Sequence, residues 1–474
     1  PYTTLFRSML LKSGSEMLEV EGSLLSMALD EMIRAEDVIV EDIPAKEEET
    51  AQGKAIYLPP FYFSEVGVAK RLNVILHNSG GIHIQPDGLP QRIQKRTGIL
   101  YDKVQMEGIL AAVASKVMVL TGGPGTGKTT TTLGIITAFR EAGASILLAA
   151  PTGRAAKRLS EATGMEAKTI HRLLEAKPPE GYKRNEENPL EGDVLIVDEC
   201  SMIDIMLMYS LLKAVPDTMT VILVGDIDQL PSVGAGNVLS DIIDSGCFPV
   251  VRLTRIFRQA QASRIIMNAH RINHGKMPDI SNGRQSDFFF IDMDKETQRK
   301  GITQVDTALI SDEAVKEIVA LTGNKLPRYY RISPRDIQVL TPMQRGVVGA
   351  TSLNQSLQAA LNPGETGLKR GGFLFKANDK VMQVRNNYDK DVFNGDIGII
   401  ASVDMEDRSL TVDFDNKTVE YDVSELDELT LAYATTIHKS QGSEYPIVVI
   451  PVLMNHFVML QRNLVYTGVT RAKK

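Results

Sequence analysis

The sequence Gly-Gly-Pro-Gly-Thr-Gly-Lys-Thr at residues 122–129 constrains the fold of this chain more than any other feature. It fits the pattern G-x-x-x-x-G-K-[ST], whose glycines let successive backbone N–H groups point at a polyphosphate. The apolar run 116–120 predicts a buried strand before it, and residues 129–142 predict a helix after it, whose N-terminus adds positive potential. A chance match in a glycine-rich turn would lack this context. The segment, a P-loop, therefore predicts a nucleoside triphosphate site where a strand meets a helix.

Two side chains of the P-loop have predicted roles of their own. Lys128 can reach the β- and γ-phosphates, and the Thr129 hydroxyl can ligate Mg²⁺. The residues expected to surround the nucleotide phosphates are Gly123, Pro124, Gly125, Thr126, Gly127, Lys128, Thr129 and Thr130.

Strands and helices alternate beyond the P-loop, which predicts a parallel sheet covered by helices. The expected strands are the apolar runs at 116–120, 146–150, 194–197 and 221–224. A polar segment follows each of them directly, and in such sheets the chemistry lies beyond the carboxyl ends of the strands. These segments are 122–129, 151–154, 198–199 and 225–229.

Three residues in these segments are candidates for hydrolysis and metal binding. Asp198 is expected to hold the Mg²⁺ shell and Glu199 to polarise the attacking water, although an isolated acidic pair is often only a solvent-facing strand end. The Gln229 amide can donate to a γ-phosphate and accept from water.

The charge of the chain limits how it could bind nucleic acid. Its formal net charge is −7, so any such binding must come from local basic surfaces. One candidate is the segment 154–172, which contains Arg154, Lys157, Arg158 and Arg172. Two cysteines cannot build a zinc site or a disulfide framework. With no apolar run near the ~18 residues of a membrane span, and no secretory leader, we expect a cytoplasmic protein without membrane contact.

The expected domain organisation has four parts. Residues 1–98 form an N-terminal segment in which 61–76 is helical and 77–97 is a linker, and residues 99–330 form the first sheet domain. Within the latter, the polar stretch 175–192 predicts a protruding hairpin or loop. A second sheet domain comprises 331–364 and 429–474, and a small β-barrel insert occupies 365–428. Because the chain begins with Pro1 and ends in a basic run, we expect a fragment of a longer protein.

The order of motifs resembles that of superfamily-1 helicases, and within them the RecD-like branch. Besides the P-loop and the segments around Asp198 and Gln229, the resemblance rests on residues 150–156, 169–174, 253–259, 434–444 and 465–472. It extends over about residues 55–474, with Cys200 replacing a usual alanine. The resemblance implies an α/β fold with two RecA-like parallel-sheet domains, an SH3-like insert and a mostly helical N-terminal segment.

The resemblance also implies further nucleotide contacts. Gln105 is similar to the glutamine that reads the adenine edge, although it could equally be a helix-surface glutamine. Arg258 and Arg471 resemble the two arginines that close on the γ-phosphate, with Arg255 a rival to Arg258. Phe257 either stacks on the adenine or is a core residue.

A groove for single-stranded DNA is implied as well. Short hydroxyls and backbone amides suit contacts to phosphates, which position a strand without reading its sequence. The residues implied are Pro151, Thr152, Gly153, Arg154, Thr169, His171, Thr436, His438 and Lys439. Taken alone, His171 is better interpreted as a buried structural histidine, and only the flanking basic residues Arg154, Lys157, Arg158 and Arg172 favour the DNA contact. The 175–192 loop corresponds by position to the pin that splits the duplex.

The expected function is that of an ATP-dependent DNA helicase, which uses ATP and Mg²⁺ and moves 5′-to-3′ on single-stranded and forked DNA. The resemblance also implies that recombination or repair proteins are possible partners. One alternative is an ATP-switched nucleic-acid clamp or RNA-directed translocase that unwinds no DNA. Another is a nuclease subunit, for which the sequence offers no extra acidic cluster of its own.

Overall fold

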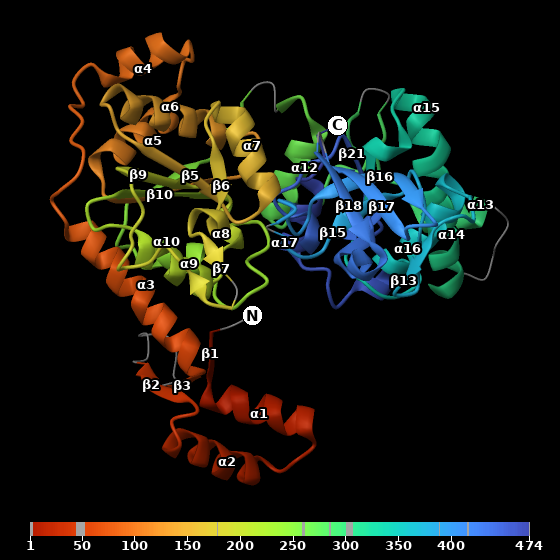
Figure 1. The fold of residues 1–474 in the computed structure, drawn as a ribbon, viewed down its shortest axis with the longest axis horizontal. Coiled ribbons are helices and arrows are strands. Elements are labelled where there is room, and N and C mark those ends of the chain that lie inside the picture. Colours follow the sequence, from red (N-terminus) through yellow and green to blue (C-terminus); the bar gives the residue numbers. More distant parts are fainter. Residues whose placement is uncertain are drawn as a thin grey trace.

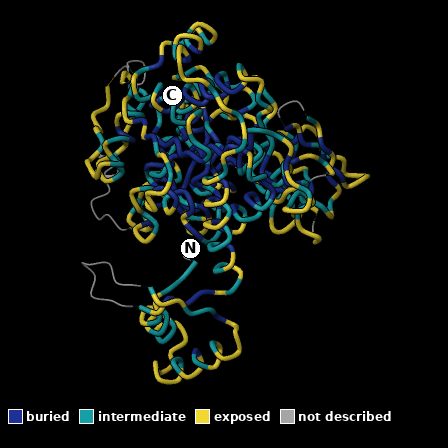
Figure 2. Tube along the Cα trace, turned by 90° about the vertical axis from the view of Figure 1, so that its left-hand side faces the viewer, coloured by how far each residue is buried: buried dark blue, intermediate teal, exposed yellow. Residues whose placement is uncertain are grey.

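A computed structural model describes residues 3–43, 53–177, 179–257, 261–283, 286–299, 307–387, 389–414 and 417–473. Two sheet-containing lobes lie side by side, and a small N-terminal unit projects from the first of them (Figure 1). Buried residues concentrate in the two lobes, whereas the N-terminal helices are mostly exposed (Figure 2). No described helix combines the length and apolarity that a bilayer span requires.

The first lobe is built on a six-stranded parallel sheet with the order β11-β4-β10-β9-β5-β6. The four predicted strands are confirmed. The strands are β4 (Val117–Gly122), β5 (Ile146–Ala150), β6 (Ala167–Thr169), β9 (Val194–Val197), β10 (Thr220–Gly225) and β11 (Val250–Leu253). Every residue of β9 and β10 is buried, as expected for central strands covered on both faces.

Helices cover both faces of this sheet. On one face lie α4 (Leu89–Thr97), α5 (Lys103–Ala114) and α6 (Lys128–Glu141). On the other lie α3 (Pro59–His77), α9 (Ile205–Ala214) and α10 (Val238–Asp244). α7 (Gly153–Thr163) follows β5 and faces the second lobe (Figure 1).

The predicted N-terminal segment 1–98 is wrong as a single unit. Only β1 (Thr4–Phe6), β2 (Ile39–Ile43), β3 (Gly53–Tyr57), α1 (Arg7–Leu18) and α2 (Gly22–Arg34) stand apart. The predicted helix 61–76 is α3, whose Val68, Leu72 and Ile75 belong to the core of the first lobe. The predicted linker 77–97 contains α4, which buries Leu89 and Ile93. These apolar side chains tie residues 59–97 to the sheet.

The second lobe contains a parallel sheet of β12 (Ile337–Thr341), β20 (Ala434–Thr436) and β21 (Ile447–Val449). Its helices include α12 (Arg264–Asn273), α13 (Met293–Arg299), α14 (Thr307–Ala320), α15 (Leu326–Tyr330), α16 (Ala350–Leu361) and α17 (Arg462–Val469). The predicted boundary at 330 is therefore wrong. α12 packs against α17, and Ile318 of α14 packs with Leu353 and Leu357, so the chain crosses between lobes soon after β11.

The insert is an antiparallel sheet with the order β18-β17-β16-β15-β19, beside the small pair β13 (Leu368–Arg370) and β14 (Phe373–Phe375). Its strands are β15 (Lys380–Gln383), β16 (Ile397–Asp404), β17 (Ser409–Phe414), β18 (Lys417–Asp422) and β19 (Leu429–Leu431). The predicted end at 428 is too early, because β19 pairs with β15. A hairpin of β7 (Ala176–Lys177) and β8 (Gly181–Tyr182) lies in the loop predicted at 175–192.

Candidate nucleotide site between the two lobes

The P-loop joins β4 to α6, and two of its own side chains donate hydrogen bonds to its backbone carbonyls. Gly125 and Gly127 have φ of 71° and 86°, a left-handed conformation that disfavours other residues. The buried Thr126 donates from Oγ1 to the Gly123 carbonyl at 2.7 Å. Lys128 Nζ donates to the Gly122 carbonyl at 2.5 Å, which places its ammonium over the loop. Thr129 is exposed in the first turn of α6.

Gln105 lies against the P-loop, so the helix-surface alternative is wrong. Its side chain is buried in α5, and Oε1 accepts from the Asp102 N–H at 3.1 Å in a capping box. Its Nε2 would clash with a Cβ added at Gly127. A ring carbon of Phe257 would lie 3.2 Å from the same point. Both side chains thus border the loop, and their contacts with adenine stay predictions.

Asp198 follows β9 and is a half-buried carboxyl next to a second one. Burial, and then the charge of Glu199, raise the pKa of Asp198 to about 6. The Glu199 N–H, which donates to Oδ1 at 2.8 Å, and the Lys128 charge oppose this rise. Glu199 itself has a left-handed φ of 53°, which is uncommon for a residue with a side chain.

These oxygens fit a magnesium ion. Mg²⁺ prefers oxygen ligands and usually takes one or two carboxylates, keeping waters and substrate phosphates as its other ligands. The Asp198 carboxylate and the Thr129 hydroxyl supply that chemistry. Across the described residues no cluster of three His, Cys, Asp or Glu side chains could hold a metal by itself.

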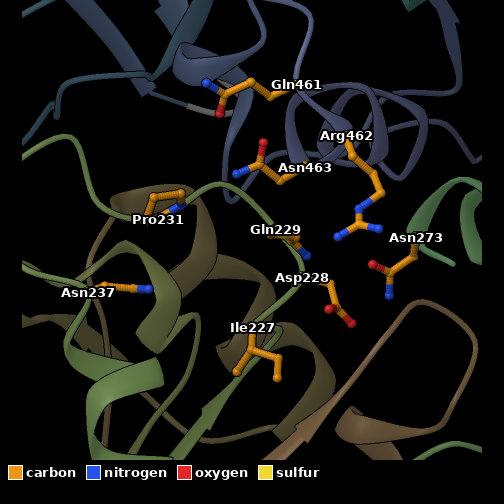
Figure 3. A pocket seen from close by; sticks show the side chains of 9 residues that line it. All are labelled: Ile227, Asp228, Gln229, Pro231, Asn237, Asn273, Gln461, Arg462 and Asn463. Carbon is orange, nitrogen blue, oxygen red and sulfur yellow. The ribbon is translucent and has the colours of Figure 1, made fainter. Parts of the chain in front are cut away.

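Gln229 lies where the second lobe meets the loop after β10. Its Nε2 donates to Asp226 Oδ2 at 3.2 Å, and Tyr466 of α17 donates to the same oxygen at 2.9 Å. An adjoining cavity of about 390 Å³ lies between this loop and α17 (Figure 3). Its lining residues are Ile227, Asp228, Gln229, Pro231, Asn237, Asn273, Gln461, Arg462 and Asn463.

Of the two candidate arginine fingers, the structure describes Arg471 but not Arg258. Arg471 is buried just beyond α17, where its guanidinium donates to the carbonyls of Thr467 and Ser443, each at 3.2 Å. Burial raises the pKa of Tyr466, and the positive charge of Arg471 opposes that rise. This effect indicates that the Arg471 guanidinium lies near the Tyr466 ring. Arg258 lies outside the described residues. Its rival Arg255 lies 3.7 Å from Asp102 and over the Phe257 ring.

The first four residues predicted to contact DNA lie at or just before the start of α7, beside the second lobe. Thr152 caps α7, and Gly442 of the second lobe approaches its hydroxyl. Arg154 donates to Ser443 Oγ at 3.0 Å, and Gly153 contacts Phe393 of the insert. Pro151 lies between β5 and α7.

The remaining members of that predicted set lie on three short segments. Thr169 caps the short helix α8 (Ile170–Leu173) by accepting from the Arg172 N–H. His171 lies 5.9 Å from the Tyr182 ring of the hairpin, and burial lowers its pKa. Thr436 ends β20, and burial lowers the pKa of both His438 and Lys439 directly after it.

Several residues at the seam make contacts that the sequence did not predict. Arg158 of α7 pairs with Glu444 at 2.5 Å and lies 3.8 Å from Glu199. His270 of α12 lies 3.3 Å from the Pro124 carbonyl, on the P-loop. Tyr466 falls inside a motif used for the resemblance, yet only the folded chain brings it to Asp226.

A P-loop in one sheet lobe, completed by helices of a second lobe, defines a two-lobed nucleotide-binding protein. Three family profiles match the chain. The "AAA domain" profile covers residues 105–235, the "ATP-dependent RecD-like DNA helicase SH3 domain" profile covers 353–414, and the "UvrD-like helicase C-terminal domain" profile covers 431–474.

Two curated relatives agree with the profiles. The chain is 38% identical over 424 residues to the ATP-dependent RecD2 DNA helicase of Deinococcus radiodurans, covering 90% of this chain and 55% of that protein. It is 31% identical over 449 residues to the RecBCD enzyme subunit RecD of Mycobacterium tuberculosis, covering 89% and 75% respectively. Pif1 helicase from Bacteroides aligns with a TM-score of 0.47 at 19% identity, covering 79% of this chain and 91% of that one. The chain belongs to the RecD-like helicase family, and its two lobes are RecA-like.

Proposed function

We propose that this chain is an ATP-dependent DNA helicase that moves 5′-to-3′ on single-stranded DNA and separates duplex strands. The observation that carries the proposal is the direct contact between the P-loop lobe and α17 at the phosphate end of the site. A nucleotide at such a seam changes how the lobes meet, which is what a motor requires. The chain spans 55% of the Deinococcus relative, a helicase by name, and family membership supports the same activity.

The site residues divide the work of hydrolysis. Lys128 and the P-loop amides hold the phosphates, and Glu199 accepts the proton of the attacking water, which Gln229 orients. Mg²⁺ held by Thr129 and Asp198 neutralises charge on the phosphates when bound. Arg471 stabilises the developing charge from the second lobe, as arginine fingers do. Arg258 completes this set in the proposal, from outside the described residues.

The DNA path follows the seam. Pro151 to Arg154 open α7 in the first lobe, and Thr436 to Lys439 follow β20 in the second, so both lobes contribute to one surface. Closing and opening of the seam lets the two groups grip a strand alternately. Melting costs only about 1.4 kcal/mol per base-pair step. The β7–β8 hairpin therefore needs only to keep the separated strands from pairing again as the protein advances.

A strand-separation assay tests this proposal. We expect the chain to unwind a duplex with a 5′ overhang, with ATP and Mg²⁺, and to leave a 3′-overhang duplex intact. Lys128→Ala is the control, since it removes the phosphate-binding ammonium while the buried residues of α6, which do not include Lys128, keep their packing. ATP turnover stimulated by DNA without strand separation would favour the clamp instead. Unwinding by Lys128→Ala would contradict the P-loop assignment.

Partners and location stay proposals. The Mycobacterium relative is named as a subunit of the RecBCD enzyme, so a partner in recombination or repair is consistent with family membership. We also propose that forked DNA is a substrate and that the protein works in the cytoplasm.

A further inference from the structure

We propose that Tyr466 and Asp226 are positioning residues that fix the orientation of the Gln229 amide only when the lobes are closed. The inference rests on the proposed ATPase function and adds a contact that couples hydrolysis to lobe position. It starts from a polar network, completely buried, that crosses the seam beside the P-loop.

Tyr466 reaches the nucleotide site from the second lobe. It is fully buried on α17, and its hydroxyl donates to Asp226 Oδ2 at 2.9 Å, across 240 positions of sequence. Burial and the nearby Asp226 carboxylate raise the pKa of Tyr466 far above its ordinary value, so the hydroxyl stays a donor. Asp226 is buried as well, and its Oδ1 accepts from the Asp228 N–H at 3.1 Å.

The carboxylate determines which way the Gln229 amide faces. A carboxylate only accepts hydrogen bonds, so the NH₂ group of Gln229 must face Asp226 and its oxygen must face away. That oxygen, Oε1, is buried and has no hydrogen-bond partner among the described residues. Buried polar atoms normally have a partner, so this atom is ready to accept from a water or ligand. The amide is thus oriented as a water-positioning glutamine requires.

Gly123 of the P-loop makes room for the same tyrosine. A Cβ added at Gly123 would lie 2.9 Å from the Tyr466 hydroxyl, closer than real Cβ contacts. Gly123 does not have a positive φ, so backbone conformation does not require glycine there. The close approach of the Tyr466 hydroxyl is what requires glycine at position 123. One hydroxyl of the second lobe therefore contacts both the P-loop and the carboxylate that holds Gln229.

The neighbouring contacts keep the loop after β10 attached to α17. The Leu230 N–H donates to Thr467 Oγ1 at 2.9 Å, and the Leu230 carbonyl accepts from Gln441 Nε2 at 2.8 Å. Because Thr467 follows Tyr466 on α17, any opening of the seam breaks these bonds together. Opening would therefore release the Gln229 amide at the moment the lobes part.

Steady-state ATPase kinetics with single-stranded DNA test the inference. We expect Tyr466→Phe and Asp226→Asn to lower kcat about ten- to hundredfold while KM for ATP changes little, because each loses a hydrogen bond to or from a carboxylate. Tyr433→Phe is the matched control. It removes another buried hydroxyl, which donates to Asp379 at 2.9 Å in the second lobe, away from the P-loop. It should lower the melting temperature comparably and leave kcat unchanged.

A double mutant separates positioning from general damage. Gly123→Ala should lower kcat by pushing the hydroxyl away, and Tyr466→Phe should remove that clash. The two kcat losses should then combine to much less than their product. If the kcat losses of Gly123→Ala and Tyr466→Phe multiply in the double mutant, or if Tyr466→Phe has the wild-type kcat, this inference is overturned while the proposed ATPase function stands. No ATP turnover in the wild type would overturn the proposed function as well, and Asp226→Asn decides the matter if Tyr466→Phe fails to fold.

Discussion

At the scale of single residues, Asp198 shows how the site trades stability for chemistry. Its carboxyl is half-buried beside Glu199, and burial followed by the charge of Glu199 raises its pKa from 3.8 to about 6. The raised pKa means that ionising this side chain costs the folded protein free energy. A magnesium-binding carboxylate has to be ionised, so the protein bears that cost at neutral pH.

We therefore expect Asp198→Asn to raise the melting temperature of the nucleotide-free protein at pH 7.5. A carboxyl whose folded pKa lies above its unfolded value stabilises the protein below about pH 4. That contribution is lost as the pH rises through about 6. The gap between variant and wild type should accordingly shrink at pH 5, where the wild-type carboxyl is mostly protonated. Thermal unfolding followed by circular dichroism at both values checks this, and a less stable variant at pH 7.5 would contradict it.

The catalytic candidates of the first lobe could be predicted from sequence because each lies in a short motif directly after a strand. Lys128, Asp198 and Gln229 follow β4, β9 and β10, neighbouring parallel strands that end at one edge of the sheet. Tyr466 and Arg158 could not be assigned in this way. Their partners lie hundreds of positions away, and only the packing of the two lobes brings them together.

At the scale of elements, apolar runs predicted the strands and the helix α3, but not what the helices pack against. An amphipathic pattern indicates which face is buried, not which sheet buries it. α3 belongs to the first lobe and α12 to the second, so the first lobe begins before the predicted residue 99 and the second lobe begins before the predicted residue 331. The linker prediction failed for α4 because its nine residues carry only two buried apolar side chains.

Two leucines distinguish α3 from the projecting N-terminal unit. Leu72 of α3 is 2% exposed in the core of the first lobe, whereas Leu24 of α2 is 59% exposed. Leu72→Ala should reduce the stability of the first lobe by about 2–5 kcal/mol through the cavity it leaves. Leu24→Ala, with the same change of volume, should have almost no effect. Urea unfolding of both variants checks this, and equal losses would contradict the burial of Leu72 in the core of the first lobe.

At the scale of the whole molecule, the seam links the phosphate site to the proposed DNA surface. Arg158 joins Glu199 of the first lobe to Glu444 of the second, and Arg154, one turn earlier on α7, contacts Ser443. The residues predicted to grip DNA open the same helix. We therefore expect a strand bound along this proposed surface to change the surroundings of Glu199, a link that sequence motifs alone do not show.

The most direct test of this account is the rate of ATP hydrolysis by the chain with and without single-stranded DNA. A seam shared by nucleotide and strand predicts that DNA increases kcat severalfold, and that Arg471→Ala keeps ATP binding but loses the turnover. An identical rate with and without DNA, in a chain that binds both, would contradict the claim that one seam serves both ligands.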